Sequence, residues 1–137
     1  MSEKEYMNKW LDAFAKDADP KKIKKYVTAK YNYLWHIFSY ELVECLEGDE
    51  ARKAFDKLEY DRAVRFYDGY SASISDVAPV GKLTAKDLDE DTRSDVYVAA
   101  EDFSWTYVRT HEDMCGPYLC IKKKSRIVAM SFCEPRS

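Results

Sequence analysis

The stretch "DVYVAAEDFSWTYVRTH" at residues 95–111 decides the fold, because it is typical of two β-strands joined by a short turn. Two runs rich in β-branched and aromatic residues flank Glu101-Asp102. A turn of even length places cross-strand partners on one face and pairs Val98 with Trp105. An odd turn would set Trp105 among serine and threonine side chains, which is a poorer burial. We therefore predict an even turn.

The even turn divides the hairpin into two faces. We expect the core face to carry Val96, Val98, Phe103, Trp105, Tyr107 and Arg109. The other face carries Tyr97, Ala99, Ser104, Thr106 and Val108. Arg109 and His111 then mark the place where the strand leaves the interior. A buried arginine there needs a carboxylate partner, for which Glu112, Asp113 or the acids of the preceding loop are candidates.

Helical spacing precedes the hairpin. An amphipathic helix carries Met7, Trp10, Leu11 and Phe14 on one stripe. Asp19 and Pro20 suit the start of a second helix, and a third begins after Gly48 with Ala51, Ala54, Phe55 and Leu58 inward. The aromatic segment Leu34 to Ser39 is predicted to be a buried strand. Further strands are expected in segments 62–70, 71–80, 118–124 and 126–132.

Helices first and strands afterwards predict an α+β fold of one domain, residues 1–137. We expect N-terminal helices packed on one face of a mostly antiparallel sheet of about five to six strands. The side chains expected to cover the core face are Trp10, Phe14, Tyr26 and Phe55.

The composition is that of a globular chain, with 46% hydrophobic and 34% charged residues. A net charge of −3 argues against general binding to nucleic acid, which needs concentrated positive charge. No apolar run approaches the roughly 18 residues of a membrane span, and the N-terminus lacks the apolar centre of a secretory signal. We therefore expect a cytoplasmic protein that binds neither nucleic acid nor membrane and keeps its cysteines as thiols.

The segment "THEDMCGPYL" at residues 110–119 holds the candidates for chemistry. A metal site there would use His111, Cys115 and Cys120, with Cys133 from farther along. The spacing lacks the close cysteine pair typical of zinc sites, so we predict neither metal nor cofactor. The alternative function is a small enzyme or ligand-binding protein, in which a histidine beside carboxylates acts as acid or base. Its site residues would be His111, Glu112, Arg109 and His36.

The most acidic stretch, residues 81–95, suggests a different function. A loop or short helix there would present its carboxylates to solvent and attract a basic protein partner. The residues of this surface would be Asp87, Asp89, Glu90, Asp91 and Asp95. We therefore expect a non-catalytic protein-binding module, with a partner-neutralising role of the immunity-protein kind and exposed tyrosines as anchors. The sequence leaves the oligomeric state open.

Two segments resemble the DUF4275 family of small bacterial proteins: "LWHIFSYELVECLEGDEARKAFD" and the later "DVYVAAEDFSWTYVRTHED" with Gly-Pro-Tyr. The resemblance covers about residues 33 to 119. It implies a bacterial cytosolic protein and no particular reaction. Leu119 departs from the pattern, which has an aromatic residue there. The matching residues are Trp35, His36, Phe38, Ser39, Gly48, Ala51, Phe55, Asp56, Trp105, Thr106, Thr110, His111, Glu112, Gly116, Pro117 and Tyr118.

Overall fold

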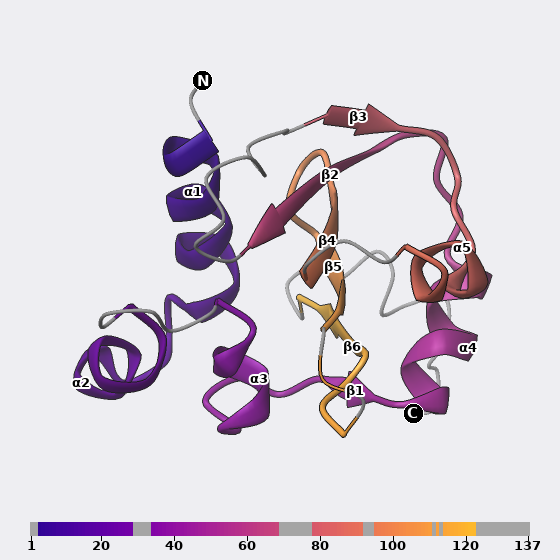
Figure 1. The fold of residues 1–137 in the computed structure, drawn as a ribbon. Coiled ribbons are helices and arrows are strands. Elements are labelled where there is room, and N and C mark those ends of the chain that lie inside the picture. The colour runs from indigo at the N-terminus through magenta and orange to yellow at the C-terminus, as the bar shows by residue number, and fades with distance from the viewer. Residues whose placement is uncertain are drawn as a thin grey trace.

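The computed structural model describes residues 3–28, 34–68, 78–91, 95–110, 112 and 114–122. Helices lead the chain and most strands follow (Figure 1). The helices are α1 (Glu3–Ala15), α2 (Pro20–Ile23), the π-helical turn η1 (Lys24–Thr28), α3 (His36–Ser39), α4 (Asp49–Lys57) and α5 (Ala85–Asp89). The strands are β1 (Leu46–Glu47), β2 (Ala63–Asp68), β3 (Ala78–Val80), β4 (Asp95–Ala100), β5 (Trp105–Arg109) and β6 (Tyr118–Ile121).

The strands form one six-stranded sheet in the order β1-β6-β5-β4-β2-β3. Every neighbouring pair in it is antiparallel. This arrangement confirms the predicted α+β fold with N-terminal helices and an antiparallel sheet. Strand β4 lies between β2 and β5, and all six of its residues are buried.

Helices cover both faces of the sheet, whereas we expected Trp10, Phe14, Tyr26 and Phe55 to cover the same face. In Figure 1, α1, α2 and α3 lie on one side of the strands, and α4 and α5 lie on the other. The indole of Trp10 packs edge-on against Tyr97 at 5.2 Å between ring centroids. The ring of Phe55 stacks on Tyr107 at 4.1 Å. Phe55 therefore covers the predicted core face, whereas Trp10 covers the opposite one.

Phe14 and Tyr26 also pack in the cluster that contains Trp10 and Tyr97. Placing these two side chains and Trp10 over Trp105 was therefore wrong. The physical reason is that β4 carries apolar side chains on both faces. The side chains of each face are removed from water only where a helix covers them.

The hairpin keeps the predicted faces with a different register. Val98 pairs with Tyr107 and not with Trp105, a shift of two residues. The loop therefore spans residues 101–104, and a shift by two leaves every side chain on its face. Phe103 is the exception, because it adopts a φ of +61° in this loop. Its ring lies against Tyr6 and Phe14 on the α1 side, not on the Trp105 face.

The predicted strand from Leu34 to Ser39 was wrong, because residues His36–Ser39 form the single helical turn α3. The backbone N–H of Phe38 donates to the carbonyl oxygen of Trp35 at 2.9 Å, which closes the turn. The backbone N–H of Trp35 donates to the hydroxyl of Tyr97 at 3.0 Å. Contact with the sheet therefore overrides the strand propensity of these aromatic residues.

Two helix starts agree with the sequence. The carboxylate of Asp19 accepts a 2.9 Å hydrogen bond from the backbone N–H of Lys21 at the start of α2. Gly48 precedes α4 with a φ of +71°. His111, Cys133 and the predicted strand 126–132 lie outside the described residues. Within the described part of the chain, no helix has the length and apolar character to cross a membrane.

Candidate functional site

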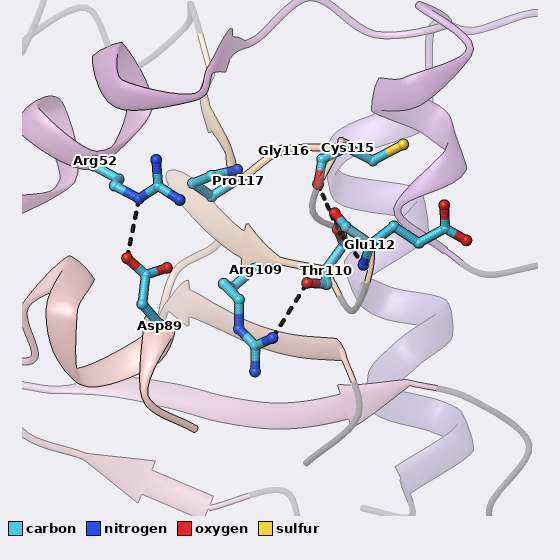
Figure 2. Close-up of a pocket in the computed structure, with 8 residues that line it drawn as sticks. All are labelled: Arg52, Asp89, Arg109, Thr110, Glu112, Cys115, Gly116 and Pro117. Atoms are coloured by element: carbon cyan, nitrogen blue, oxygen red, sulfur yellow. Dashed lines mark hydrogen bonds and ion pairs between the residues drawn. The ribbon is translucent and has the colours of Figure 1, made fainter. Parts of the chain in front are cut away.

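A polar cavity of about 220 Å³ opens where α4, α5 and the end of β5 meet the loop that leads to β6 (Figure 2). The residues that line it come from three segments of the chain: α4, α5 and residues 109–117. They are Arg52, Asp89, Arg109, Thr110, Glu112, Cys115, Gly116 and Pro117. The sequence singled out Arg109, Glu112 and Cys115 from one segment and Asp89 from another, and the fold brings these four together.

Arg52 joins the two helices beside the cavity. Its Nη1 donates to the Asp49 carboxylate at 2.8 Å, and its Nε donates to the Asp89 carboxylate at 3.0 Å. Asp49 begins α4 and Asp89 ends α5, so one guanidinium holds carboxylates from both helices. Arg52 and Asp49 were not among the residues predicted from the sequence. The signal available was an arginine three residues after a helix-starting aspartate.

Arg109 is half-buried at the end of β5 and points toward α5. Its Nε donates to the carbonyl oxygen of Leu88 at 3.0 Å, and another guanidinium nitrogen donates to the carbonyl oxygen of Asp91. Carbonyl groups at the end of a helix lack partners within it, and a positive charge there is favourable. The Arg109 guanidinium therefore binds the backbone carbonyl groups of the acidic segment and holds α5 against the sheet.

Thr110 organises the loop on the other side of the cavity. Its buried hydroxyl donates to the carbonyl oxygen of Cys115 and accepts from the backbone N–H of Glu112 at 3.3 Å. The loop then passes through Gly116, whose φ is +84°. A Cβ atom on Gly116 would lie 3.1 Å from the Tyr118 ring, so only glycine fits without strain.

The five carboxylates predicted to form one binding surface have different environments. Asp87, Asp89 and Glu90 are exposed on α5 and at its end. Asp91 is half-buried and accepts a 2.7 Å hydrogen bond from the Tyr67 hydroxyl. Asp95 is fully buried in β4, so its carboxylate is not part of an exposed surface.

Asp87 has a structural role as well. It completes a capping box in which the backbone N–H of Thr84 donates to its carboxylate at 2.8 Å. This hydrogen bond from the Thr84 backbone holds the pKa of Asp87 below its usual value, because it favours the charged form.

His36 lies away from the cavity. Its Nδ1 is 2.8 Å from the Ser39 hydroxyl, and its ring packs on Trp35 within the α3 turn. It is not among the residues that line the cavity with Arg109 and Glu112. Of the four residues in the alternative site, the structure therefore brings together only these two, and His111 is outside the described part.

The cysteines of the described residues react slowly as nucleophiles at neutral pH. Burial, followed by the Glu112 charge, raises the pKa of Cys115, and burial raises the pKa of Cys120 to about 11. Both are therefore thiols at neutral pH. Within the ranges that the structure describes, no group of three histidine, cysteine, aspartate or glutamate side chains is arranged to hold a metal ion.

Comparison with known proteins gives one family. A family model described as a domain of unknown function (DUF4275) matches residues 3–119. This match confirms the resemblance seen in the sequence and extends it to the first helix. No curated protein and no solved structure gives a significant match.

Proposed function

The chain belongs to the DUF4275 family, and on that premise we propose that it is a non-catalytic protein-binding module. The surface that supports the proposal is an acidic ridge on α4 and α5. It consists of Asp49, Glu50, Asp87, Asp89 and Glu90, all exposed. The same helices also carry one further carboxylate, Asp56, and four cations, Arg52, Lys53, Lys57 and Lys86. The excess of negative charge favours a basic partner.

One observation carries the proposal: Asp89 belongs to the acidic ridge and also lines the polar cavity. The cavity, about 220 Å³, is smaller than the 300–1,000 Å³ typical of small-molecule sites. It suits a single side chain of a partner that is drawn to the ridge. Met114 in the same loop is 93% exposed and offers an apolar contact beside the cavity.

Such a surface fits a partner-neutralising role of the immunity-protein kind, in which charge accelerates association and a central side chain fixes the register. Among the residues that the structure describes, Tyr40 is exposed (51%), but it follows α3 on the other side of the sheet and does not border the ridge. Met114 replaces the exposed tyrosine anchors in the proposal.

The test is affinity capture from lysate of the source cells with three forms of the full chain. The double variant Glu50→Gln/Glu90→Gln removes two ridge charges and leaves the Arg52 ion pairs and the α5 capping box intact. The control Glu41→Gln removes an exposed charge next to α3, on the other side of the sheet.

The proposal predicts that wild type and Glu41→Gln capture the same protein. The double variant should bind this protein with lower affinity. Two screened charge pairs of about 0.5 kcal/mol each correspond to about fivefold in affinity. Titration of the purified partner measures that ratio. Equal binding by all three forms would refute the acidic ridge as the docking surface.

A further inference from the structure

Two cysteines lie opposite each other at the edge of the sheet. Strand β1 pairs with β6 through Leu46 with Leu119 and Glu47 with Tyr118. Continuing this antiparallel register by one residue sets Cys45 opposite Cys120. The third described cysteine, Cys115, lies in the preceding loop and has no such position.

The hydrogen bonds of this strand pair determine the kind of position the cysteines occupy. The backbone N–H of Gly48 donates to the carbonyl oxygen of Pro117 at 2.8 Å, which marks Gly48 and Pro117 as a hydrogen-bonded pair. Hydrogen-bonded and non-hydrogen-bonded pairs alternate along antiparallel strands. Cys45 and Cys120 therefore occupy a non-hydrogen-bonded position, where Cα atoms are about 4.5 Å apart and side chains are closest. Disulfides span Cα separations of about 4.4–6.8 Å.

The two side chains also lie on the same side of the sheet. Cys120 is buried in the cluster that packs under α1, and Cys45 is half-buried against the same cluster. Electrostatics agrees with this proximity. Burial, followed by the neighbouring Cys120, Glu47 and Glu44, raises the pKa of Cys45 to about 12. Lys122 and Glu44 are the charged groups that act on Cys120.

We propose that Cys45 and Cys120 are a modification site, at which a low-molecular-weight disulfide oxidises them to an intramolecular disulfide. With oxidised glutathione, the thiolate of the more accessible Cys45 attacks one glutathione sulfur and releases one glutathione thiolate. The Cys120 thiolate then attacks the Cys45 sulfur, forms the new S–S bond and releases the second glutathione. The two cysteines lose two electrons to the glutathione disulfide, and their two protons leave with the released thiols.

The bond would form beside a cavity that Cys120 and the residues before Cys45 help to line. This cavity, about 510 Å³, is lined by residues before β1, by residues at and just after the end of β6, and by residues at the end of α1 and just after it. The first two groups are Leu42, Val43 and Glu44, and Cys120, Ile121 and Lys122. Oxidation would hold the segment before β1 against β6 and so fix the part of the cavity lining that these two segments form. The inference stands apart from the acidic ridge on the other side of the sheet.

The test uses the native full chain with oxidised glutathione, acid quenching and mass spectrometry of peptides under non-reducing conditions. The expected product is a linked pair of peptides with the bond between Cys45 and Cys120. Fragmentation assigns it, because Tyr118 and Leu119 separate Cys115 from Cys120. The wild-type peptide map needs no variant and does not depend on the folding of one.

Three serine variants supply the matched controls. Cys115→Ser should form the disulfide at the wild-type rate, whereas Cys45→Ser and Cys120→Ser should stop at a glutathione adduct or stay reduced. A bond that includes Cys115 or Cys133 would overturn the proposal. So would a disulfide that forms only after denaturation.

Discussion

The indole N–H of Trp10 donates a 2.8 Å hydrogen bond to the hydroxyl of Thr106, and both side chains are fully buried. The same hydroxyl donates to the carbonyl oxygen of Val98 at 3.0 Å. One polar chain therefore links α1, β5 and β4 inside an otherwise apolar layer. Because buried polar groups are costly without partners, this chain fixes how α1 sits on the sheet.

Removing either end of this bond should destabilise the fold. Trp10→Phe loses the donor and part of the ring, for about 2–3 kcal/mol. Thr106→Val leaves the indole N–H without its acceptor, for about 1–3 kcal/mol. The double variant should cost about 1 kcal/mol less than the sum of the two, because the shared bond is lost only once. Denaturant unfolding of the four proteins measures this coupling, and strict additivity would show that the bond contributes nothing.

The two glycines with positive φ should respond differently to alanine. The Cβ atom of Gly48→Ala would have no neighbour within 4 Å. The loss of stability should therefore come only from the backbone strain of a φ of +71°, about 1 kcal/mol or more. Gly116→Ala adds a contact of 3.1 Å with the Tyr118 ring to a φ of +84°. Thermal or denaturant unfolding should rank Gly116→Ala as the more damaging. The reverse order would show that the loop beside the cavity relaxes freely.

The start of α5 should give a pH-dependent contribution to stability. Because the pKa of Asp87 is lowered in the folded protein, its contribution is present above the unfolded value of about 4. It is lost as the pH falls through the lowered folded value. The stability difference between wild type and Asp87→Ala should therefore shrink below about pH 4. Thr84→Ser keeps the capping hydroxyl and serves as the control, with a wild-type pH profile. A difference for Asp87→Ala that is constant from neutral to acid pH would contradict the capping role.

The thiol of Cys45 should react slowly at neutral pH and speed up steeply with pH. Because burial, the neighbouring Cys120 and the nearby Glu47 and Glu44 raise its pKa to about 12, the thiolate fraction grows tenfold for each pH unit well below that value. Iodoacetamide labelling, followed by peptide mass spectrometry, should show a rate that still rises at pH 9. In denaturant, the rate should level off near the ordinary thiol pKa of about 8.5. A native rate that levels off near pH 8.5 would mean that Cys45 is not buried against β6.

The alternation of side chains made the faces of the hairpin predictable. Trp105 and Tyr107 are 7% and 0% exposed, as the even turn requires. The register itself was not predictable, because loops of two and four residues have the same parity. The second buried face was legible in "VYVAA" at residues 96–100, since a continuous apolar run is typical of a strand covered on both sides.

Only part of the candidate site could be predicted from the sequence. Arg109 and Glu112 are three residues apart, at and just after the end of a strand with few polar positions, so a single segment contains both. Arg52 lies more than fifty residues earlier on an ordinary charged helix, and only the packing of α4 beside α5 brings it to Asp89. The turn α3 was missed because its local propensity favours a strand and its helical turn is held by Tyr97 of the sheet.

The central claim is that the acidic ridge steers a basic partner to the cavity beside Asp89. The most direct measurement is the association rate constant of the captured partner at increasing ionic strength, for wild type and for Glu50→Gln/Glu90→Gln. The account predicts a wild-type rate that falls steeply with salt and a lower, flatter rate for the variant, with little change in dissociation. Identical association rates with the same salt dependence would contradict it.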